Sequence, residues 1–276
     1  MTRADIPAVA QLFHRELSSG AAPEAWCRVM DVPWAVEQPN HGYLLRDNTR
    51  VVGAYHAFYS ERVIDGRRHQ ICNLGAWCVE DKHRAAGLRM LRALLRQPGY
   101  TFTDLSPSGN VPALNTRLGF AMLDTQTAVI PNLPWPWRSQ GVRVIDGPKE
   151  MDELLCGQEQ QIYRDHRETV VNHVVLVKGD RHCYLVFRRE TRRHLRVFAS
   201  ILYVSDPELF RECAPHLYRY LLLRHGMAAT LVELRVLGYR PARSVMTAGC
   251  PKMYLSEDLA PGQVDYLYSE LTCRAW

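Results

Sequence analysis

The sequence contains few lysines, and its longest basic runs are Arg188-Arg189 and Arg192-Arg193-His194, which predict a solvated hairpin end or an anion or partner site. Only four of its 34 basic residues are lysine, and the arginines are scattered over the 276 residues, so the formal net charge of +5 is spread along the chain. A protein that follows nucleic-acid phosphates needs positive charge gathered on one surface. We therefore expect no nucleic-acid partner.

Paired metal ligands and long apolar runs are also missing. The eight cysteines form no Cys-x-x-Cys pair and have no histidine at ligand spacing, which argues against a zinc site and is typical of core cysteines in a reducing compartment. No apolar run approaches the roughly 18 residues of a spanning helix, and the first residues lack an apolar signal core. We expect a cytoplasmic protein without a metal and without a membrane partner.

The composition that is present is that of a globular protein, with 47% apolar and 23% charged residues. At roughly 100–200 residues per domain, the length predicts two domains. The stretch Pro131–Trp137 holds three prolines in seven residues and cannot form a helix. The predicted ranges are 1–131 for the first domain, 132–141 for the linker and 142–276 for the second domain.

The spacing of apolar residues predicts an alternation of helices and strands in the first half. Asp65-Gly66 between two long β-rich runs is a hairpin signal, so the flanking strands should be antiparallel. The predicted helices are 2–17, 23–30 and 83–96, with a loop and short helix over 107–118. The predicted strands are 42–46, 51–64, 67–79, 100–105 and 119–130.

The second half follows a similar order. A helix over 148–165 precedes strands over 170–177, 182–188 and 195–204, and a helix over 207–223 leads to a strand over 229–234. The shared order of long strand, helix and strand suggests a duplicated architecture, although no residue-level repeat is evident. The C-terminal stretch Asp265–Glu270, with two tyrosines, predicts either core packing or the lining of a cleft.

One strand-to-helix connection has the features of an anion site. Val79–Arg89 passes through a small-residue turn that carries Arg84 and Gly87. Unpaired N–H groups and the positive dipole end at a helix start suit a pyrophosphate, and a glycine lets the phosphate approach the main chain. The alternative is an ordinary connection capped by Asp81.

Three segments in order resemble the GNAT acyltransferase superfamily over residues 2–130. They are the opening Thr2–Ala8, the run Arg84-Ala-Ala-Gly87, which resembles the R/Q-x-x-G-x-G/A signature, and Asn110…Ala113…Leu118-Gly-Phe120. The resemblance implies an α/β fold (an α+β mixed sheet) with two GNAT-like domains, each a mixed, largely antiparallel twisted sheet flanked by helices. Its fourth and fifth strands would splay apart to admit pantetheine.

The resemblance also implies a cofactor site for acetyl-CoA or another acyl-CoA as co-substrate. Pantetheine would bond to the main chain of Trp77, Cys78 and Val79. The pyrophosphate would lie on the N–H groups of Arg84, Ala85, Ala86, Gly87, Leu88 and Arg89. Asn110 would contact the cofactor arm, or would serve only as a helix N-cap.

This sequence departs from the family pattern at three positions. Arg89 replaces a small residue and adds a cation that can pair with phosphate. The usual acid, a tyrosine, falls on Asn115 or Arg117, and the position of a carboxylate base falls on Asn73, which takes no proton at neutral pH. The catalytic candidates that remain, each also explicable as a capping, solvated or packing residue, are Asp104, Tyr59 and Glu80.

The second half lacks an Arg-x-x-Gly turn and resembles the degenerate half of tandem proteins of this family, so we expect one CoA per chain. The resulting hypothesis is an acyl-CoA-dependent N-acyltransferase for a small amine-bearing metabolite held between the halves, faced by Tyr59, Asp104 and Glu233. The alternatives are a non-catalytic acyl-CoA-binding module, and a transferase that uses a carrier-protein or aminoacyl-tRNA donor. The sequence leaves the oligomeric state open, with a homodimer as one option.

Overall fold

The computed structural model describes residues 1–17, 20–134, 141–192 and 195–274, and the chain divides into two compact units. The first unit contains residues 1–123, 251–264 and 268–276, and the second contains 124–250 and 265–267. The expected ranges were 1–131 and 142–276. The first unit instead ends its N-terminal part at residue 123 and also contains C-terminal residues. Most of the expected linker, residues 135–140, lies outside the described residues.

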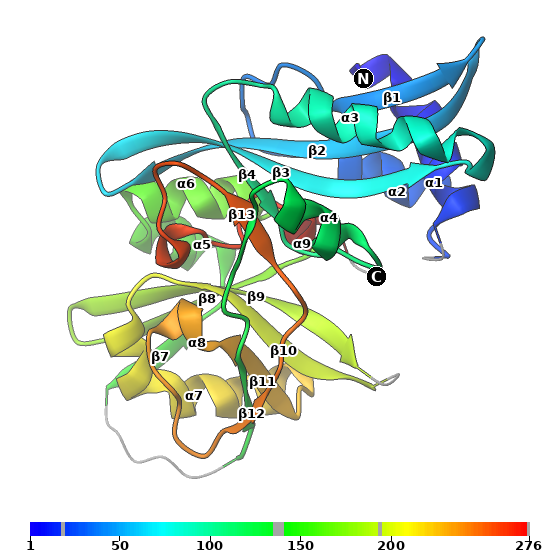
Figure 1. The fold of residues 1–276 in the computed structure, drawn as a ribbon. Coiled ribbons are helices and arrows are strands. Elements are labelled where there is room, and N and C mark those ends of the chain that lie inside the picture. The colour runs from blue at the N-terminus through cyan, green and yellow to red at the C-terminus, as the bar shows by residue number, and fades with distance from the viewer. Residues whose placement is uncertain (18–19, 135–140, 193–194, 275–276) are drawn as a thin grey trace. The chain divides into compact units, whose positions relative to one another are not determined.

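The first unit is built on a six-stranded sheet in the order β1-β2-β3-β4-β13-β5 (Figure 1). All neighbours are antiparallel except β3 and β4, which are parallel. Its strands are β1 (Gly42–Asp47), β2 (Arg50–Ile64), β3 (Arg67–Val79), β4 (Tyr100–Asp104), β5 (Ala121–Met122) and β13 (Met253–Leu255).

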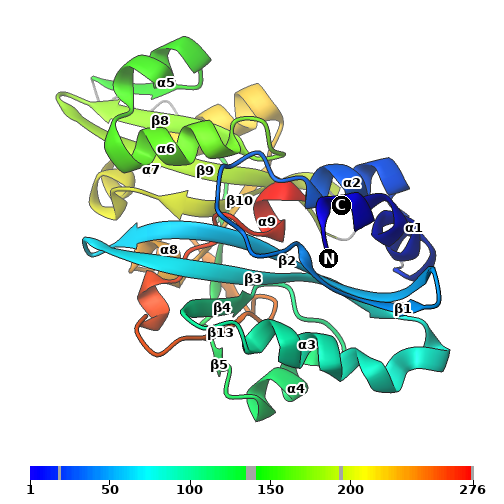
Figure 2. The same ribbon diagram turned by 90° about the horizontal axis from the view of Figure 1, so that it is seen from above.

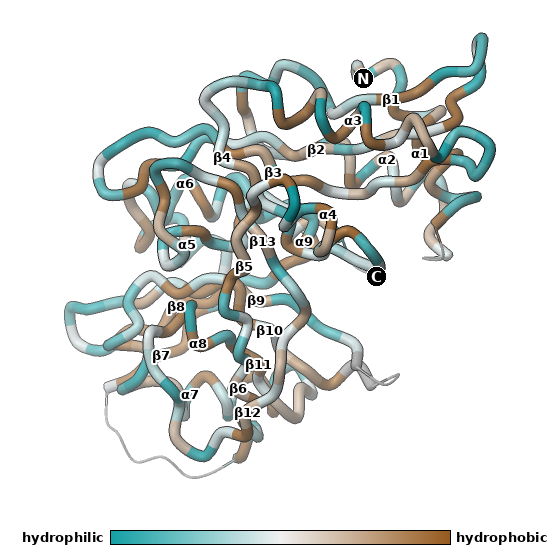
Figure 3. Tube along the Cα trace, viewed as in Figure 1, coloured by the Kyte–Doolittle hydropathy of each residue, from teal (hydrophilic) through white to brown (hydrophobic). Residues whose placement is uncertain are grey.

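The predicted hairpin between β2 and β3 is confirmed. Asp65 and Gly66 have φ values of 50° and 76°, as a two-residue turn that follows the strand twist requires. The tip of this hairpin is hydrophilic, whereas β2 carries a long buried run (Figure 3).

Helices cover both faces of the first sheet (Figure 2). On one face, Phe13 and Trp26 belong to a core with Ala54 of β2. On the other, Leu91 and Leu94 pack in a core with Leu74. The helical segments of this unit are η1 (Arg3–Asp5), α1 (Ile6–Glu16), α2 (Pro23–Met30), η2 (Asp81–Ala86), α3 (Gly87–Leu95), α4 (Val111–Arg117), η3 (Pro261–Gln263) and α9 (Glu270–Cys273).

The second unit has a seven-stranded sheet in the order β12-β6-β11-β10-β9-β8-β7. Only β10 and β11 are parallel. Its strands are β6 (Thr127–Pro131), β7 (Val142–Ile145), β8 (Asn172–Lys178), β9 (Arg181–Arg192), β10 (Leu195–Val204), β11 (Ala229–Glu233) and β12 (Val245–Thr247). The expected class of mixed, largely antiparallel sheets flanked by helices is therefore confirmed.

The prediction of a single helix over 148–165 in the second unit is wrong. The chain forms two helices there because Cys156 is extended and Gly157 has a φ of 55°, a conformation outside the right-handed helix. The helices are α5 (Pro148–Leu154), α6 (Gly157–His166), α7 (Pro207–His225) and α8 (Leu234–Leu237).

No helix among the described residues of the chain is long and apolar enough to cross a membrane.

Each sheet takes one strand from the other half of the sequence. The predicted strand over 119–130 is two strands, of which β5 lies at the edge of the first sheet and β6 lies between β11 and β12 of the second. In return, β13 from the end of the chain lies between β4 and β5. This exchange explains why the units differ from the predicted ranges.

The two sheets repeat one pairing pattern. The parallel ladder of the first sheet ends at Asn73↔Thr103, and that of the second ends at Ile201↔Val232. Directly after the end of each parallel ladder, the neighbouring antiparallel pair shows a register shift. It lies between Tyr55 and Ala57 in the β2–β3 pair and between Ile201 and Tyr203 in the β9–β10 pair. A short repeat that the sequence analysis missed, Leu118-Gly-Phe120 and Leu237-Gly-Tyr239, follows α4 and α8, and both glycines have positive φ.

Candidate active site

The first sheet opens between β3 and β4. Their parallel ladder ends at Asn73↔Thr103, while β3 continues to Val79 and pairs only with β2 on its other side. Within this stretch Gly75 and Ala76 together oppose His56, which is a β-bulge that bends the strand away. The residues expected to hold pantetheine, Trp77 to Val79, lie on this unpaired edge.

A cleft of about 420 Å³ lies at this opening, and every residue that lines it belongs to the first unit. Lining residues come from the end of α1, from α2 and β2, from the bulge of β3, from the end of β4 and the loop after it, from α4 and from the C-terminal helix α9. Its aromatic walls are Trp26, Tyr55, Phe58 and Trp77. Its ionisable side chains, besides Tyr55, are Glu16, His56, Asp104, Glu270 and Arg274.

Asp104 is the last residue of β4 and is 4% exposed. Burial, followed by repulsion from Glu270, raises its pKa to about 7, against the opposing hydrogen bonds from Asn115 and the Ser106 backbone. The Asn115 amide donates to its Oδ2 at 2.8 Å. A carboxyl group with this pKa both takes and returns protons near neutral pH.

Glu270 is a second buried carboxyl group of the cleft, and the sequence analysis did not select it. The Ser106 hydroxyl donates to its Oε1 at 2.7 Å, and its backbone N–H donates to Asn73 Oδ1 at 3.4 Å. The Asn73 amide also donates to Thr103 Oγ1 at 3.0 Å. Asn73 and Asn115 therefore hold this corner of the cleft together by hydrogen bonds. The resemblance implied the usual base position at Asn73 and the usual acid position at Asn115 or Arg117.

Tyr55 and His56 line the same cleft but stay in one protonation state. Burial, with the negative charges of Asp104 and Glu270, raises the Tyr55 pKa well above its usual value, so the hydroxyl keeps its proton. The Tyr55 ring stacks on Trp77 at 4.8 Å with an interplanar angle of 3°. Burial lowers the pKa of His56 to about 3, which keeps its ring neutral.

The expected phosphate cradle is a 3-10 helix. The segment η2 runs directly into α3, and the Gly87 N–H donates to the Arg84 carbonyl. A Cβ at Gly87 would lie 3.2 Å from Val79 Cγ2 and 3.3 Å from Trp77 Cζ2, so the glycine lets α3 approach β3. Binding of pyrophosphate over Arg84–Arg89 stays a prediction, now with a packing reason for Gly87 beside the expected one.

The side chains of this segment reach solvent. Arg84 pairs with Asp81 at 3.0 Å, so Asp81 forms an ion pair and not the cap weighed from the sequence. Arg89 is exposed, as is Ala85, while Ala86 and Leu88 are half-buried. Asn110 stands at the N-cap position of α4 without a side-chain capping bond.

The other two predicted catalytic residues do not line the cleft. The Tyr59 hydroxyl bonds to Asn40 at 2.8 Å and to Gln97 at 3.1 Å in a fully buried position. The Glu80 carboxylate forms ion pairs with Arg50 at 2.7 Å and with Arg15 at 3.3 Å. Of the three, only Asp104 lines the cleft.

Glu233, expected to face the same cleft, lies in the second unit and is not among the lining residues. It follows Val232, the last ladder residue of β11, just as Asp104 follows Thr103. Glu233 is 7% exposed and accepts a hydrogen bond from the Tyr266 hydroxyl. Burial raises the pKa of that hydroxyl.

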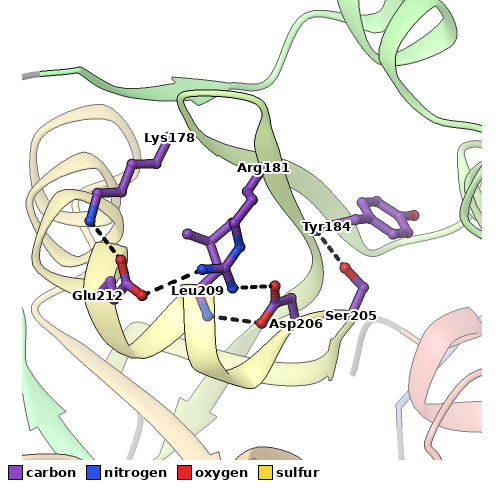
Figure 4. A network of polar contacts seen from close by, with 7 residues as sticks. All are labelled: Lys178, Arg181, Tyr184, Ser205, Asp206, Leu209 and Glu212. Carbon is purple, nitrogen blue, oxygen red and sulfur yellow. Dashed lines mark hydrogen bonds and ion pairs between the residues drawn. The ribbon is translucent and has the colours of Figure 1, made fainter.

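The helix that follows β10 begins with acidic residues (Figure 4). Asp206 caps α7 by accepting from the Leu209 N–H at 2.8 Å, and it pairs with Arg181 at 2.9 Å. Glu212 pairs with Lys178 at 2.6 Å in the next turn. A capped, acidic helix start is unsuited to phosphate, in keeping with the expectation of one CoA per chain, which stays a prediction.

No family model and no curated protein sequence matches the chain. A GCN5-related N-acetyltransferase from Anabaena variabilis superposes with a TM-score of 0.59 at 11% identity, over 92% of this chain and 71% of that chain. One from Kribbella flavida gives 0.56 at 14% identity, over 92% and 69%.

A solved structure from Pyrococcus horikoshii gives a TM-score of 0.55 at 14% identity and covers 99% of this chain and 94% of that chain. The chain therefore has the fold of the GCN5-related N-acetyltransferases, as the sequence motifs implied. Likeness at this identity establishes the fold, and the chemistry rests on the cleft itself.

Proposed function

We propose that the chain is an acyl-CoA-dependent N-acyltransferase that moves an acyl group, acetyl in the first instance, directly from the thioester to a small amine-bearing metabolite. The observation that carries this proposal is Asp104, a buried carboxyl group with a pKa near 7 at the open end of the β3–β4 splay. Carboxyl groups whose pKa is strongly raised and that line a cleft are typical of sites of proton transfer.

In the proposed reaction the acceptor arrives as an ammonium ion and gives one proton to the Asp104 carboxylate. The neutral amine nitrogen then attacks the thioester carbonyl, the N–C bond forms and the C–S bond breaks. The bonded nitrogen gives its second proton to the leaving thiolate, directly or through water, and the Asp104 carboxyl group then returns its own proton to solvent. Positioning in the splay supplies much of the rate, as it does when two reactants are held in contact.

The remaining parts of the proposal rest on the sequence and on the fold. Pantetheine lies along Trp77–Val79, the pyrophosphate binds over Arg84–Arg89, and Asn110 contacts the cofactor arm. The second unit is a degenerate copy of the first, supported by the repeated ladder ends and bulges. The location is cytoplasmic, and no metal, membrane or nucleic acid takes part.

The test is thiol release from acetyl-CoA with a panel of amines, using Asp104→Asn as the central variant. This variant keeps the shape of the side chain and removes the proton acceptor, so we expect transfer to fall at least 100-fold with CoA affinity unchanged. In the wild type, kcat/KM should rise with pH through about 7 as Asp104 ionises. Glu80→Gln, outside the cleft, is the matched control. Full activity in Asp104→Asn would refute the proposal.

A further inference from the structure

The cleft is acidic at one corner and aromatic along its walls. Three of its lining side chains are carboxylic acids, Glu16, Asp104 and Glu270, against one arginine, Arg274, among the described lining residues. His56 adds no charge because its buried ring is neutral. A ligand that brings a positive charge is therefore favoured over a neutral or anionic one.

Asp104 has no cationic partner among the described residues. Its hydrogen bonds come from neutral donors, the Asn115 amide at 2.8 Å and the Ser106 backbone N–H. Ionisation of a carboxyl group that is 4% exposed and lacks a counter-ion is costly. An ammonium group of a ligand would supply the missing counter-ion at this position.

The aromatic side chains of the cleft add flat apolar surface to its walls. Tyr55 and Trp77 are stacked face to face, and Phe58 lies edge-on to His56 at 4.4 Å. Leu17, Val29 and Val111 add aliphatic surface, and the hydroxyl groups of Ser106 and Ser108 also line the cleft. Aromatic walls bind aromatic rings by burial and by edge or face contacts.

Resting on the proposed function, we propose that the acceptor is an arylalkylamine, a primary amine joined by a short chain to an aromatic ring. The amine meets Asp104, and the ring lies against the Tyr55, Phe58 and Trp77 walls. A cleft of about 420 Å³ is near the lower end of the range for small-molecule sites and suits a ligand of this size. Glu16 is exposed and lies at the rim, where it draws cations toward the cleft.

The first experiment compares acceptors with the full chain and acetyl-CoA. We expect kcat/KM for 2-phenylethylamine and tryptamine to exceed that for putrescine and for glucosamine at least tenfold. A tenfold preference for putrescine would assign the site to a diamine that spans Asp104 and Glu16. A preference for glucosamine, or equal rates for all four amines, would likewise overturn the inference. Each of these three outcomes leaves the proposed acyltransferase function standing.

The second experiment measures binding without any acyl donor, by calorimetry. We expect 2-phenylethylamine to bind at least tenfold more tightly than 2-phenylethanol, and Asp104→Asn to remove that difference while binding 2-phenylethanol as the wild type does. Glu16→Gln at the rim is the matched control and should weaken the amine much less. Binding with this pattern but without transfer would refute the proposed function and support the ligand class. Equal binding of the amine and the alcohol would overturn the ligand class.

Discussion

The two units place a carboxylic acid at the same point of the same pairing pattern and give it different surroundings. Asp104 and Glu233 each follow the last residue of a parallel ladder. Asp104 receives hydrogen bonds from neutral donors and lines a cleft, whereas Glu233 accepts a bond from the Tyr266 hydroxyl. The repeated strand pairing therefore sets the position of the carboxyl group in each unit, and the surrounding residues determine whether that group lines a cleft.

The two units also differ in the charge at the start of one helix. This is the η2–α3 segment after β3 in the first unit and α7 after β10 in the second. The η2–α3 segment carries Lys82, His83, Arg84 and Arg89 and has no side-chain cap. The α7 start carries the capping Asp206, with Glu208 in its first turn. The first arrangement suits an anionic ligand and the second does not.

The largest expected effect separates the two acids. Asp104→Asn should lower acyl transfer at least 100-fold, because it removes a proton acceptor in the cleft. Glu233→Gln should leave the rate per folded molecule within about threefold, because the glutamine can still accept from Tyr266. Steady-state kinetics at saturating acetyl-CoA measures both. Loss of transfer in Glu233→Gln together with retained transfer in Asp104→Asn would reverse the assignment.

The stability of the first unit should depend on pH through Asp104. The folded pKa of about 7 lies above the unfolded value of 3.8, so the folded state binds more protons between these values. Stability contributed by this group is present at low pH and is lost as the pH rises through 7, by roughly 4 kcal/mol from the pKa difference. Asp104→Asn should therefore raise the melting temperature at pH 8 and change it little at pH 4. Equal effects at both values would show that the carboxyl group is not destabilised by burial.

A smaller effect is expected at the helix starts, measured as CoA affinity. Arg84→Ala and Arg89→Ala should each raise the CoA dissociation constant by about threefold to tenfold, because each removes a cation near the expected pyrophosphate. Lys178→Ala in the second unit should not change it. Calorimetry should give one CoA per chain. A second equivalent of bound CoA, or sensitivity to Lys178, would give the second unit a donor site.

Local signals in the sequence predicted much of the fold. The Asp65-Gly66 turn fixed a hairpin because its two residues tolerate the positive φ that such a turn requires. The exchange of β6 and β13 could not be predicted, because a strand's own pattern does not say which sheet it joins. The split of the helix over 148–165 depended on the single residue pair Cys156-Gly157.

The candidate site was predictable in part. Asp104 was found because a strand-end carboxylate is a local feature. Glu270 was missed because 164 residues separate it from its partner Ser106. Gly87 has no side chain, and the same sequence signal fits a phosphate approach and the packing of α3 on Trp77. In the sequence, Asn73 and Asn115 indicated only that the usual catalytic groups are missing, although in the structure both form hydrogen bonds in the corner that holds Asp104 and Glu270.

The smallest effect compares the residues that precede the two helical segments. Asp206 accepts from the Leu209 N–H, while Glu80 makes no capping bond and instead pairs with Arg50 and Arg15. Asp206→Ala should lower the free energy of unfolding by about 1 kcal/mol, the usual loss for an N-cap. Asp206→Asn should lose less, because asparagine caps as well as aspartate does. Glu80→Ala removes only partly exposed ion pairs and should lose less than Asp206→Ala. Denaturant titration of the three variants measures the order, and a larger loss in Glu80→Ala would mean that the first helix start, not the second, depends on its acidic residue.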